Sequence, residues 1–552
     1  MIGVGAVIGM TLAMLGNTTA NGAETGAAQV QEEALDRTIL EIREAAVSRD
    51  GRHAAEIVIR REGMEGTKQV VLLDGQQIIP SQRLDHPVQG LVFHGDHLAY
   101  SIGGNLFVDK EPLRQPSAFS PDDEHFASAT LKGSGWTVEV DGQALFELDD
   151  VAGRFGTSTV GSLRAGQKLL FCPGGKHVAC ALWRTGSALV ATDVQAWPAL
   201  DAALGIGPIA LSSDGRHVAY AVQTIPHPQL AGKWCVVVDG QAGPAEFSAV
   251  QSVVMSFDGQ HVAYCGNVGN KWVVVRDGQR SPGYDGIGTL VMSPDGKLVT
   301  YSTQKAGKWV VVTNGQAGPE FDRIGPFIVS PDGTRVAYAG AKADGWVAVT
   351  DGHPGPRYDW IRADTLRFTG DSKHVVYAGL RNETWTVITD GQAGPECADF
   401  DLLTMNPSGK GFVYAAQRGT ERWGVVTDGQ MGPEFNRIVS VCFSPDGSRM
   451  AYVAARGSNW VVVVDGVSYQ GTDAARNVVF SPDNRHVAYV GSKSGEPPSE
   501  YVVLDGRPGP EYGHIISGPT FRSDATVEYL SVKGRNLYRV KHSLQAVTPK
   551  GK

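Results

Sequence analysis

Hydrophobic and polar residues along this chain follow a pattern that returns about every 38 residues. One copy consists of Phe443 to Gly447 (FSPDG), Met450 to Tyr452 (MAY), Trp460 to Val464 (WVVVV) and the pair Asp465-Gly466. The Asp-Gly or Asn-Gly pair that ends each regular copy begins at residues 239, 277, 314, 351, 390, 428, 465 and 505. A spacing this regular predicts an array of one supersecondary unit.

The pattern inside one copy predicts four short strands. Proline and glycine in Ser-Pro-Asp-Gly favour a tight turn between the first two strands, the second of which alternates as in Val487-Ala488-Tyr489. The third strand is a β-branched run such as Trp309 to Val312, which fits a strand buried on both faces. Asp-Gly then predicts a two-residue hairpin. Proline in the following Gly318-Pro319 places the fourth strand at the edge of its sheet.

Four strands in about 40 residues have the dimensions of one β-propeller blade. First-hairpin signals centre on thirteen residues: Asp50, Asp96, Asp122, Gly174, Asp214, Asp258, Asp295, Asp332, Asp371, Ser408, Asp446, Asp483 and Asp524. Propellers typically close with four to eight blades. We therefore expect an all-β chain of tandem propellers, the first over residues 41–249 with degenerate repeats and the second over residues 250–542 with regular ones.

The signal Ser-Pro-Asp-Gly, three further residues and then Ala-Tyr resembles the TolB-type family of WD-like β-propeller repeats in bacterial envelope proteins. The resemblance covers nearly all of the chain after its N-terminal segment, and it is specific for fold rather than for function, since the matching residues are turn and core residues. The extension Asp-Gly-Gln-x-Gly-Pro departs from the TolB pattern. The resemblance implies a periplasmic or surface-exposed propeller that serves as a binding platform.

The termini and the overall charge narrow the class of protein. Residues 1–23 contain an apolar run from Ile2 to Leu15 followed by small residues, which predicts a secretory signal peptide rather than a membrane span in the mature chain. Residues 24–40 are expected to form a helical lead-in, because apolar residues between Gln31 and Ala46 follow a helical spacing. Residues 543–552 form a C-terminal tail. A net charge of −9 argues against a nucleic-acid partner.

Repeated side chains are expected to be structural, because each has one fixed place in the copy. Eight tryptophans precede the Asp-Gly turn, or its equivalent, by five residues and are expected to pack between blades. Repeated histidines and aspartates fall at the turns, which favours capping over metal binding or paired catalytic carboxylates. Most of the six cysteines are expected in the core, and Cys172 with Cys180 could form a disulfide across one hairpin.

Three tryptophans break the register, namely Trp183, Trp197 and Trp360, and are the candidate partner contacts. The sequence contains no catalytic motif, and we expect no catalytic residue, cofactor or metal. These features predict an exported, periplasmic or secreted platform for a protein partner in the cell envelope. A glycan- or small-ligand-binding propeller is the alternative, followed by an enzyme with a site in the irregular early blades. We expect the partner site near the insertions at residues 156–167 and 197–207.

Overall fold

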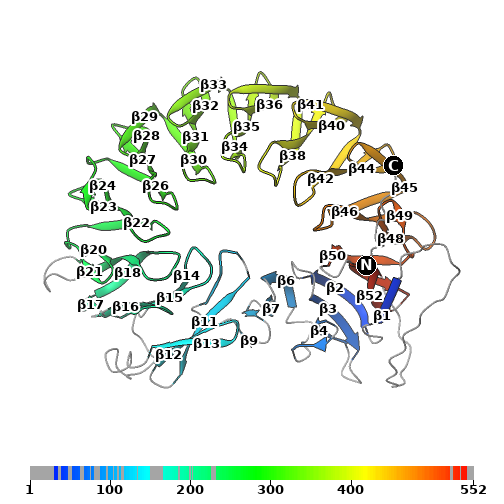
Figure 1. The fold of residues 1–552 in the computed structure, drawn as a ribbon, viewed down its shortest axis with the longest axis horizontal. Helices are drawn as coiled ribbons and strands as arrows, with labels where there is room; N and C mark the ends of the chain where they lie inside the picture. The colour runs from blue at the N-terminus through cyan, green and yellow to red at the C-terminus, as the bar shows by residue number, and fades with distance from the viewer. Residues whose placement is uncertain are drawn as a thin grey trace, which may run out of the picture. The chain divides into compact units, whose positions relative to one another are not determined.

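The structure is a computed structural model. It describes residues 30–34, 39–47, 53–61, 67–74, 76–79, 82, 88–94, 97–102, 105–108, 111–112, 117–122, 124–132, 135–148, 166–184, 187–197, 200–201, 203–224, 232–522, 526–534 and 536–543. Every helix or strand assigned in these residues is a strand, and the strands form thirteen four-stranded antiparallel sheets (Figure 1). The expected all-β, propeller-type array of thirteen repeats is confirmed.

The chain divides into two compact units, Met1–Leu113 with Phe400–Lys552 (unit 1) and Arg114–Asp399 (unit 2). These limits are not those of the segments 41–249 and 250–542, and the division into two rings stays a prediction. The expected signal peptide, residues 1–23, lies outside the described residues, as does all but the first residue of the expected tail.

Seven sheets lie wholly in unit 2, each in chain order. They are β10 (Ser117–Phe119), β11 (Phe126–Lys132), β12 (Gly135–Val140) and β13 (Gln143–Leu148); β14 (Gly166–Phe171), β15 (Val178–Arg184), β16 (Ser187–Thr192) and β17 (Leu200–Asp201); β18 (Ala203–Leu211), β19 (Val218–Thr224), β20 (Lys233–Val238) and β21 (Gln241–Ala242); β22 (Ala249–Met255), β23 (Val262–Val268), β24 (Lys271–Arg276) and β25 (Gln279–Arg280); β26 (Gly286–Met292), β27 (Val299–Lys305), β28 (Lys308–Thr313) and β29 (Gln316–Phe321); β30 (Arg323–Val329), β31 (Val336–Lys342), β32 (Gly345–Thr350) and β33 (His353–Tyr358); β34 (Trp360–Phe368), β35 (Val375–Arg381), β36 (Thr384–Thr389) and β37 (Gln392–Cys397).

The other sheets belong to unit 1, apart from Asp399 at the start of β38. They are β2 (Ile39–Val47), β3 (Ala54–Arg61), β4 (Thr67–Leu73) and β5 (Gln76–Gln77); β6 (Val88–His94), β7 (His97–Ile102), β8 (Asn105–Val108) and β9 (Glu111–Pro112); β38 (Asp399–Met405), β39 (Phe412–Arg418), β40 (Arg422–Thr427) and β41 (Gln430–Phe435); β42 (Arg437–Phe443), β43 (Met450–Arg456), β44 (Asn459–Val464) and β45 (Val467–Thr472); β46 (Ala474–Phe480), β47 (Val487–Lys493), β48 (Ser499–Leu504) and β49 (Arg507–Pro508); and β50 (His514–Phe521), β51 (Thr526–Lys533) and β52 (Asn536–Ser543) with β1 (Val30–Ala34).

One sheet joins the two ends of the chain. Strand β1 pairs antiparallel with β52, from Val30 opposite His542 to Ala34 opposite Tyr538. In every other sheet the four strands are consecutive in the chain. The sheet of β50 to β52 therefore takes its outer strand from the N-terminal segment.

The predicted helical lead-in was wrong, because the described residues of that segment are strands. Strand β2 covers Ile39–Val47 and pairs with β3, with register shifts between Ile39 and Glu41 and between Ile42 and Glu44. A β-bulge adds one residue to a strand and interrupts the two-residue alternation. Two bulges in nine residues produce an apolar spacing that imitates a helix.

The hydrophobic core is a series of layers between neighbouring sheets. One layer joins Cys265 and Val274 of the sheet β22 to β25 with Leu290, Tyr301 and Val312 of the sheet β26 to β29. The third strand β28 is buried on both faces, since Val311 lies in the layer shared with the next sheet and Val312 lies in this layer, 2% and 3% exposed. Half-buried Trp272 packs against the same layer, as expected for a tryptophan at the fixed register. Burial on both faces of these strands confirms the interpretation of their valine runs.

Candidate functional site

The repeated aspartates of the first hairpins build turns. Ser293 Oγ donates a hydrogen bond to Asp295 Oδ1 over 2.6 Å, and the same oxygen accepts the amide of Lys297 at 3.1 Å. The serine hydroxyl is the main cause that lowers the pKa of Asp295 to about 2. The same Ser–Asp contact recurs in other copies, for example from Ser256 to Asp258. These carboxylates are held by their own turns, as expected for turn-forming residues.

The repeated histidines connect the two turns of one sheet. His261 Nδ1 donates to Asp277 Oδ2 at 2.9 Å, while Asp277 Oδ1 accepts the amide of Val262 at 2.9 Å. In another copy an arginine does the same work, because Arg335 Nε donates to Asp351 Oδ2 at 2.8 Å. Histidine and arginine thus occupy the same position in different copies and donate to the turn aspartate in the same way, so the role of this position is to hold that aspartate. In the part of the chain that the structure describes, no group of His, Cys, Asp and Glu side chains could hold a metal ion.

These histidines also set the spacing between neighbouring sheets. A Cβ placed on Gly259 would lie 2.5 Å from the Cβ of His217, which belongs to the preceding sheet. The same relation recurs between Gly296 and His261, where the nearest ring atom would be 2.4 Å away. Glycine is therefore required in these turns for the close approach of the next sheet as well as for its positive φ of 72° and 69°.

Cys172 and Cys180 are free thiols that lie in separate core layers. Cys172 packs with Trp197 and Tyr220, whereas Cys180 packs with Leu169 and Ala191. Burial raises the pKa of both thiols to about 12. The possible disulfide between them is absent because the two side chains belong to opposite faces of one sheet.

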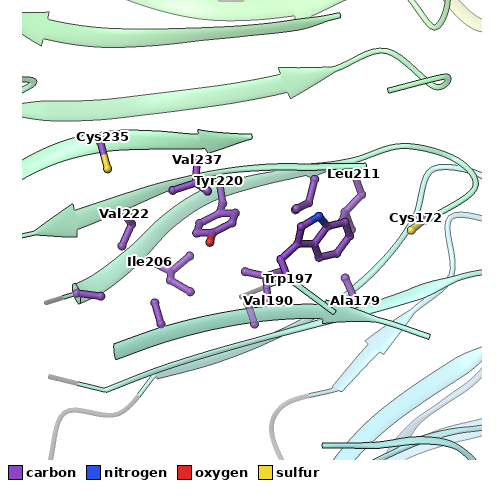
Figure 2. Close-up of a cluster of buried hydrophobic side chains, with 14 residues drawn as sticks. Cys172, Ala179, Val190, Trp197, Ile206, Leu211, Tyr220, Val222, Cys235 and Val237 are labelled. Atoms are coloured by element: carbon purple, nitrogen blue, oxygen red, sulfur yellow. The ribbon is translucent and has the colours of Figure 1, made fainter. Parts of the chain in front are cut away.

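Two of the three off-register tryptophans offer no described surface. The side chain of Trp183, in β15, lies outside the described residues. Trp197 is 3% exposed and packs among Val190, Leu211 and Tyr220 (Figure 2). The prediction that Trp197 contacts a partner was wrong. Its indole is buried in the core layer against Leu211 and Tyr220 of the neighbouring sheet.

Of the two off-register tryptophans whose side chains the structure describes, Trp360 is the one that reaches the surface. Its side chain is 46% exposed at the start of β34. The indole meets Trp346 of the preceding sheet edge-on, with ring centroids 5.0 Å apart and an interplanar angle of 65°. Arg323 lies over the other ring of this pair, 5.4 Å from the Trp346 centroid. The half-buried indole of Trp346 therefore packs against the exposed indole of Trp360, and the guanidinium of Arg323 stacks on Trp346.

Strand β34 departs from its neighbours in length as well. It has nine residues, whereas β30 has seven, and the register shift in its pairing spans Arg362 to Arg367, whereas that of β30 spans Ile324 to Phe327. The extra residues form a closed bulge, because Thr365 Oγ1 donates to the Arg362 carbonyl at 2.5 Å and accepts the Ala378 amide at 2.9 Å. Bulges of this kind redirect side chains and are frequent beside functional sites.

Strand β34 carries charged residues, whereas most first strands of the unit 2 sheets carry few or none. Several first strands of neighbouring sheets contact one another, among them β30 and β34, and in unit 2 the first strands follow one side of the row of sheets (Figure 1). In the described first strands of the seven unit 2 sheets, charged residues stand at Lys168, Arg323, Arg362, Asp364 and Arg367. Four of these five belong to β30 and β34.

Within this group the charges are partly paired. Arg362 Nε lies 3.3 Å from Asp364 Oδ1, with side chains 43% and 69% exposed, and Arg367 Nη2 donates to the Asp364 carbonyl at 3.5 Å. Arg362 thus pairs with the carboxylate of Asp364, Arg367 contacts the backbone of the same residue, and exposed Asp322 and Asp359 directly precede the two strands. Trp360, Arg362, Asp364 and Arg367 with Arg323 and Trp346 form what we call the β34 surface.

The β34 surface lies outside the insertions at residues 156–167 and 197–207, where the sequence predicted the partner site. The charged residues of the β34 surface were not singled out from the sequence. Residues 151–165 are outside the described residues, so most of the first insertion is untested. A signal did exist, since the Asp-Gly pairs at 351 and 390 are 39 residues apart and those at 314 and 351 only 37. The longer interval contains the two residues that β34 adds.

Comparisons with known proteins cover sequence families, curated proteins and solved structures. No family model matches the chain. No curated protein matches it. Among solved structures it is similar to hydrazine synthase of Kuenenia stuttgartiensis, the tricorn protease and TolB of Acinetobacter baumannii, each at 13% identity and with TM-scores of 0.22, 0.22 and 0.20. The matches cover 53%, 81% and 54% of this chain and 94%, 55% and 79% of those chains. In the described residues no helix has the length and apolar character to cross a bilayer.

Proposed function

We propose that this protein is an exported, non-enzymatic β-propeller that binds a protein partner in the cell envelope or outside the cell, through the β34 surface. The observation that carries the proposal is Trp360, an indole 46% exposed on the strand that also carries Arg362 and Arg367, while Arg323 lies over its partner ring, Trp346. Tryptophan and arginine dominate the binding energy of protein interfaces. Export is supported by the apolar run from Ile2 to Leu15 and by the envelope proteins that share these repeats.

The test is site-specific crosslinking in cells that express the chain. A photoreactive phenylalanine at Ala363, which is exposed on the β34 bulge, is compared with one at Thr289, which is exposed on the shorter, seven-residue strand β26. We expect a discrete crosslinked protein from position 363 and none from position 289. Trp360→Ala should remove that crosslink while lowering stability by only about 1 kcal/mol, the typical worth of an aromatic pair. Equal crosslinking from both positions would overturn the β34 surface as the binding site.

Glycan binding is a second candidate, because Trp360 places an exposed indole on the same strand as the Asp364 carboxylate. Aromatic faces beside polar groups are also what sugar sites use. Titrating a panel of oligosaccharides while following tryptophan fluorescence separates the two candidates. A saturable change that Trp360→Ala abolishes would favour the glycan, and its absence together with a crosslinked protein would favour the protein partner.

A further inference from the structure

The outer edges of the sheets are protected in a consistent way. Six of the described fourth strands have six residues, namely β13, β29, β33, β37, β41 and β45. Proline interrupts four of them, at Pro319, Pro356, Pro395 and Pro433. Proline lacks the amide that a further strand would need, and charged side chains oppose edge-to-edge pairing. Each proline strand also carries a charged residue directly after its proline, and β13 carries Glu147.

Strand β45 has neither protection. Its sequence is Val-Ser-Tyr-Gln-Gly-Thr, with Gln470 in the place of the proline and Gly471 in the place of the charge. Gly471 has a φ of 107° and its carbonyl accepts the hydroxyl of Tyr501 at 3.3 Å, so the unprotected part of the edge is residues 467–470. Val467 is 58% exposed, the highest value among the exposed large hydrophobic residues that the structure describes. The sheet β42 to β45 therefore ends in an uncharged, proline-free strand with an apolar side chain in water.

The hairpin before β45 determines which of its backbone groups face outward. Asp465 and Gly466 have φ values of 49° and 80°, as a two-residue turn with two left-handed positions requires. Val467 lies opposite Val464, and Ser468 lies opposite Val463. In such a hairpin the pair next to the turn is hydrogen-bonded, and the following residue points its amide and carbonyl away. Ser468 thus presents both groups to the open side of β45.

We propose that β45 accepts an extended segment of a partner protein as a fifth strand of its sheet. The added backbone supplies the hydrogen bonds, and an apolar residue of the segment covers Val467. Exposed Asp473 stands at the end of the strand, whereas Asp465 before its start is already paired with Arg449 Nε at 2.7 Å. The segment is therefore uncharged at its centre and carries lysine or arginine at the end that meets Asp473, and a probe with lysine at both ends meets it in either orientation. This surface belongs to unit 1 and does not depend on the β34 surface in unit 2.

The probe is a fluorescent peptide of alternating valine and threonine with a lysine at each end, titrated with the full chain and followed by anisotropy. We expect saturable binding of this peptide. Replacing its terminal lysines with glutamates should weaken binding at least tenfold, and replacing its central residue with proline should abolish it. Gln470→Pro, which restores the proline of the regular strands, should weaken binding at least tenfold. Val467→Glu should do the same at an exposed position that tolerates polar side chains.

The matched control is Gln430→Glu, which adds the same charge at the first residue of the proline-protected strand β41. It should leave peptide binding unchanged. Binding that survives both Gln470→Pro and Val467→Glu, or no saturable binding to the unaltered chain, would overturn the proposal. A dimer in sedimentation that Gln470→Pro converts to monomer would overturn the assigned occupant and identify a second copy of this chain instead.

Discussion

The contact between Gly259 and His217 predicts that one methyl group forces two sheets apart. In Gly259→Ala the new Cβ would start 2.5 Å from the His217 Cβ and 2.4 Å from its Cδ2. Carbon atoms in contact prefer about 3.5–4.0 Å, so the turn must move by roughly 1 Å. The ring has little room to turn away, because His217 Nδ1 is hydrogen-bonded to Asp239 at 2.9 Å.

The expected cost has two parts, which a control separates. A non-glycine residue in the left-handed region costs about 1–2 kcal/mol, and overpacking adds about 1–3 kcal/mol. Gly278 has a similar φ of 79° but would meet no atom within 4 Å. We therefore expect Gly278→Ala to lower the free energy of unfolding by about 1 kcal/mol and Gly259→Ala by about 2–4 kcal/mol.

Urea denaturation measures the loss of unfolding free energy of the whole chain. Hydrogen exchange of the Val262 amide measures the local loss beside the turn. Adding His217→Ala to Gly259→Ala removes the ring atoms and should recover part of the overpacking cost, whereas His217→Ala alone should destabilise. Equal losses in Gly259→Ala and Gly278→Ala would refute the inter-sheet contact as the reason for the glycine.

Three further outcomes follow from burial. Trp272→Ala should lower the free energy of unfolding by about 2–4 kcal/mol, because the half-buried indole packs in an inter-sheet layer; an unchanged urea midpoint would contradict this role. Burial lowers the pKa of His542 from 6.5 to about 4, so the unfolded chain binds the proton first and stability falls as pH drops below about 7. From pH 7 to pH 5 this group should cost about 2 kcal/mol, a loss that His542→Phe removes from the measured pH dependence. Cys172 and Cys180 should resist alkylation in the folded chain and react after unfolding, and rapid labelling of the native protein would show that they are accessible.

The sequence predicted the sheets well because turn chemistry marks both ends of most strands. Ser-Pro-Asp-Gly and Asp-Gly state where one strand stops and the next begins, independently of distant contacts. Strand β2 escaped this reasoning, because its two bulges shift the apolar residues from a spacing of two to a spacing near three. A bulge is set by the partner strand, which a periodicity within one segment does not contain.

The candidate site was only partly predictable for a related reason. Trp360 was found because it breaks the register of the repeated tryptophans, but the same signal also selected Trp197, which is 3% exposed. Whether an off-register indole is buried depends on the neighbouring sheet, here through Tyr220 and Leu211. Arg362 and Asp364 attract no attention in the sequence, since nothing within one repeat shows that the pairing of β34 shifts register between Arg362 and Arg367.

The pairing of β1 with β52 has a consequence for the order in which this chain folds. Val30 and His542 are about 500 residues apart, and contacts of such separation form late because the whole intervening chain must first be brought together. During synthesis, sheets made of consecutive strands can form as they emerge, whereas the sheet of β50 to β52 waits with an open edge for a segment made long before. Because β1 and β52 belong to one sheet, a truncation that removes either strand damages the same sheet.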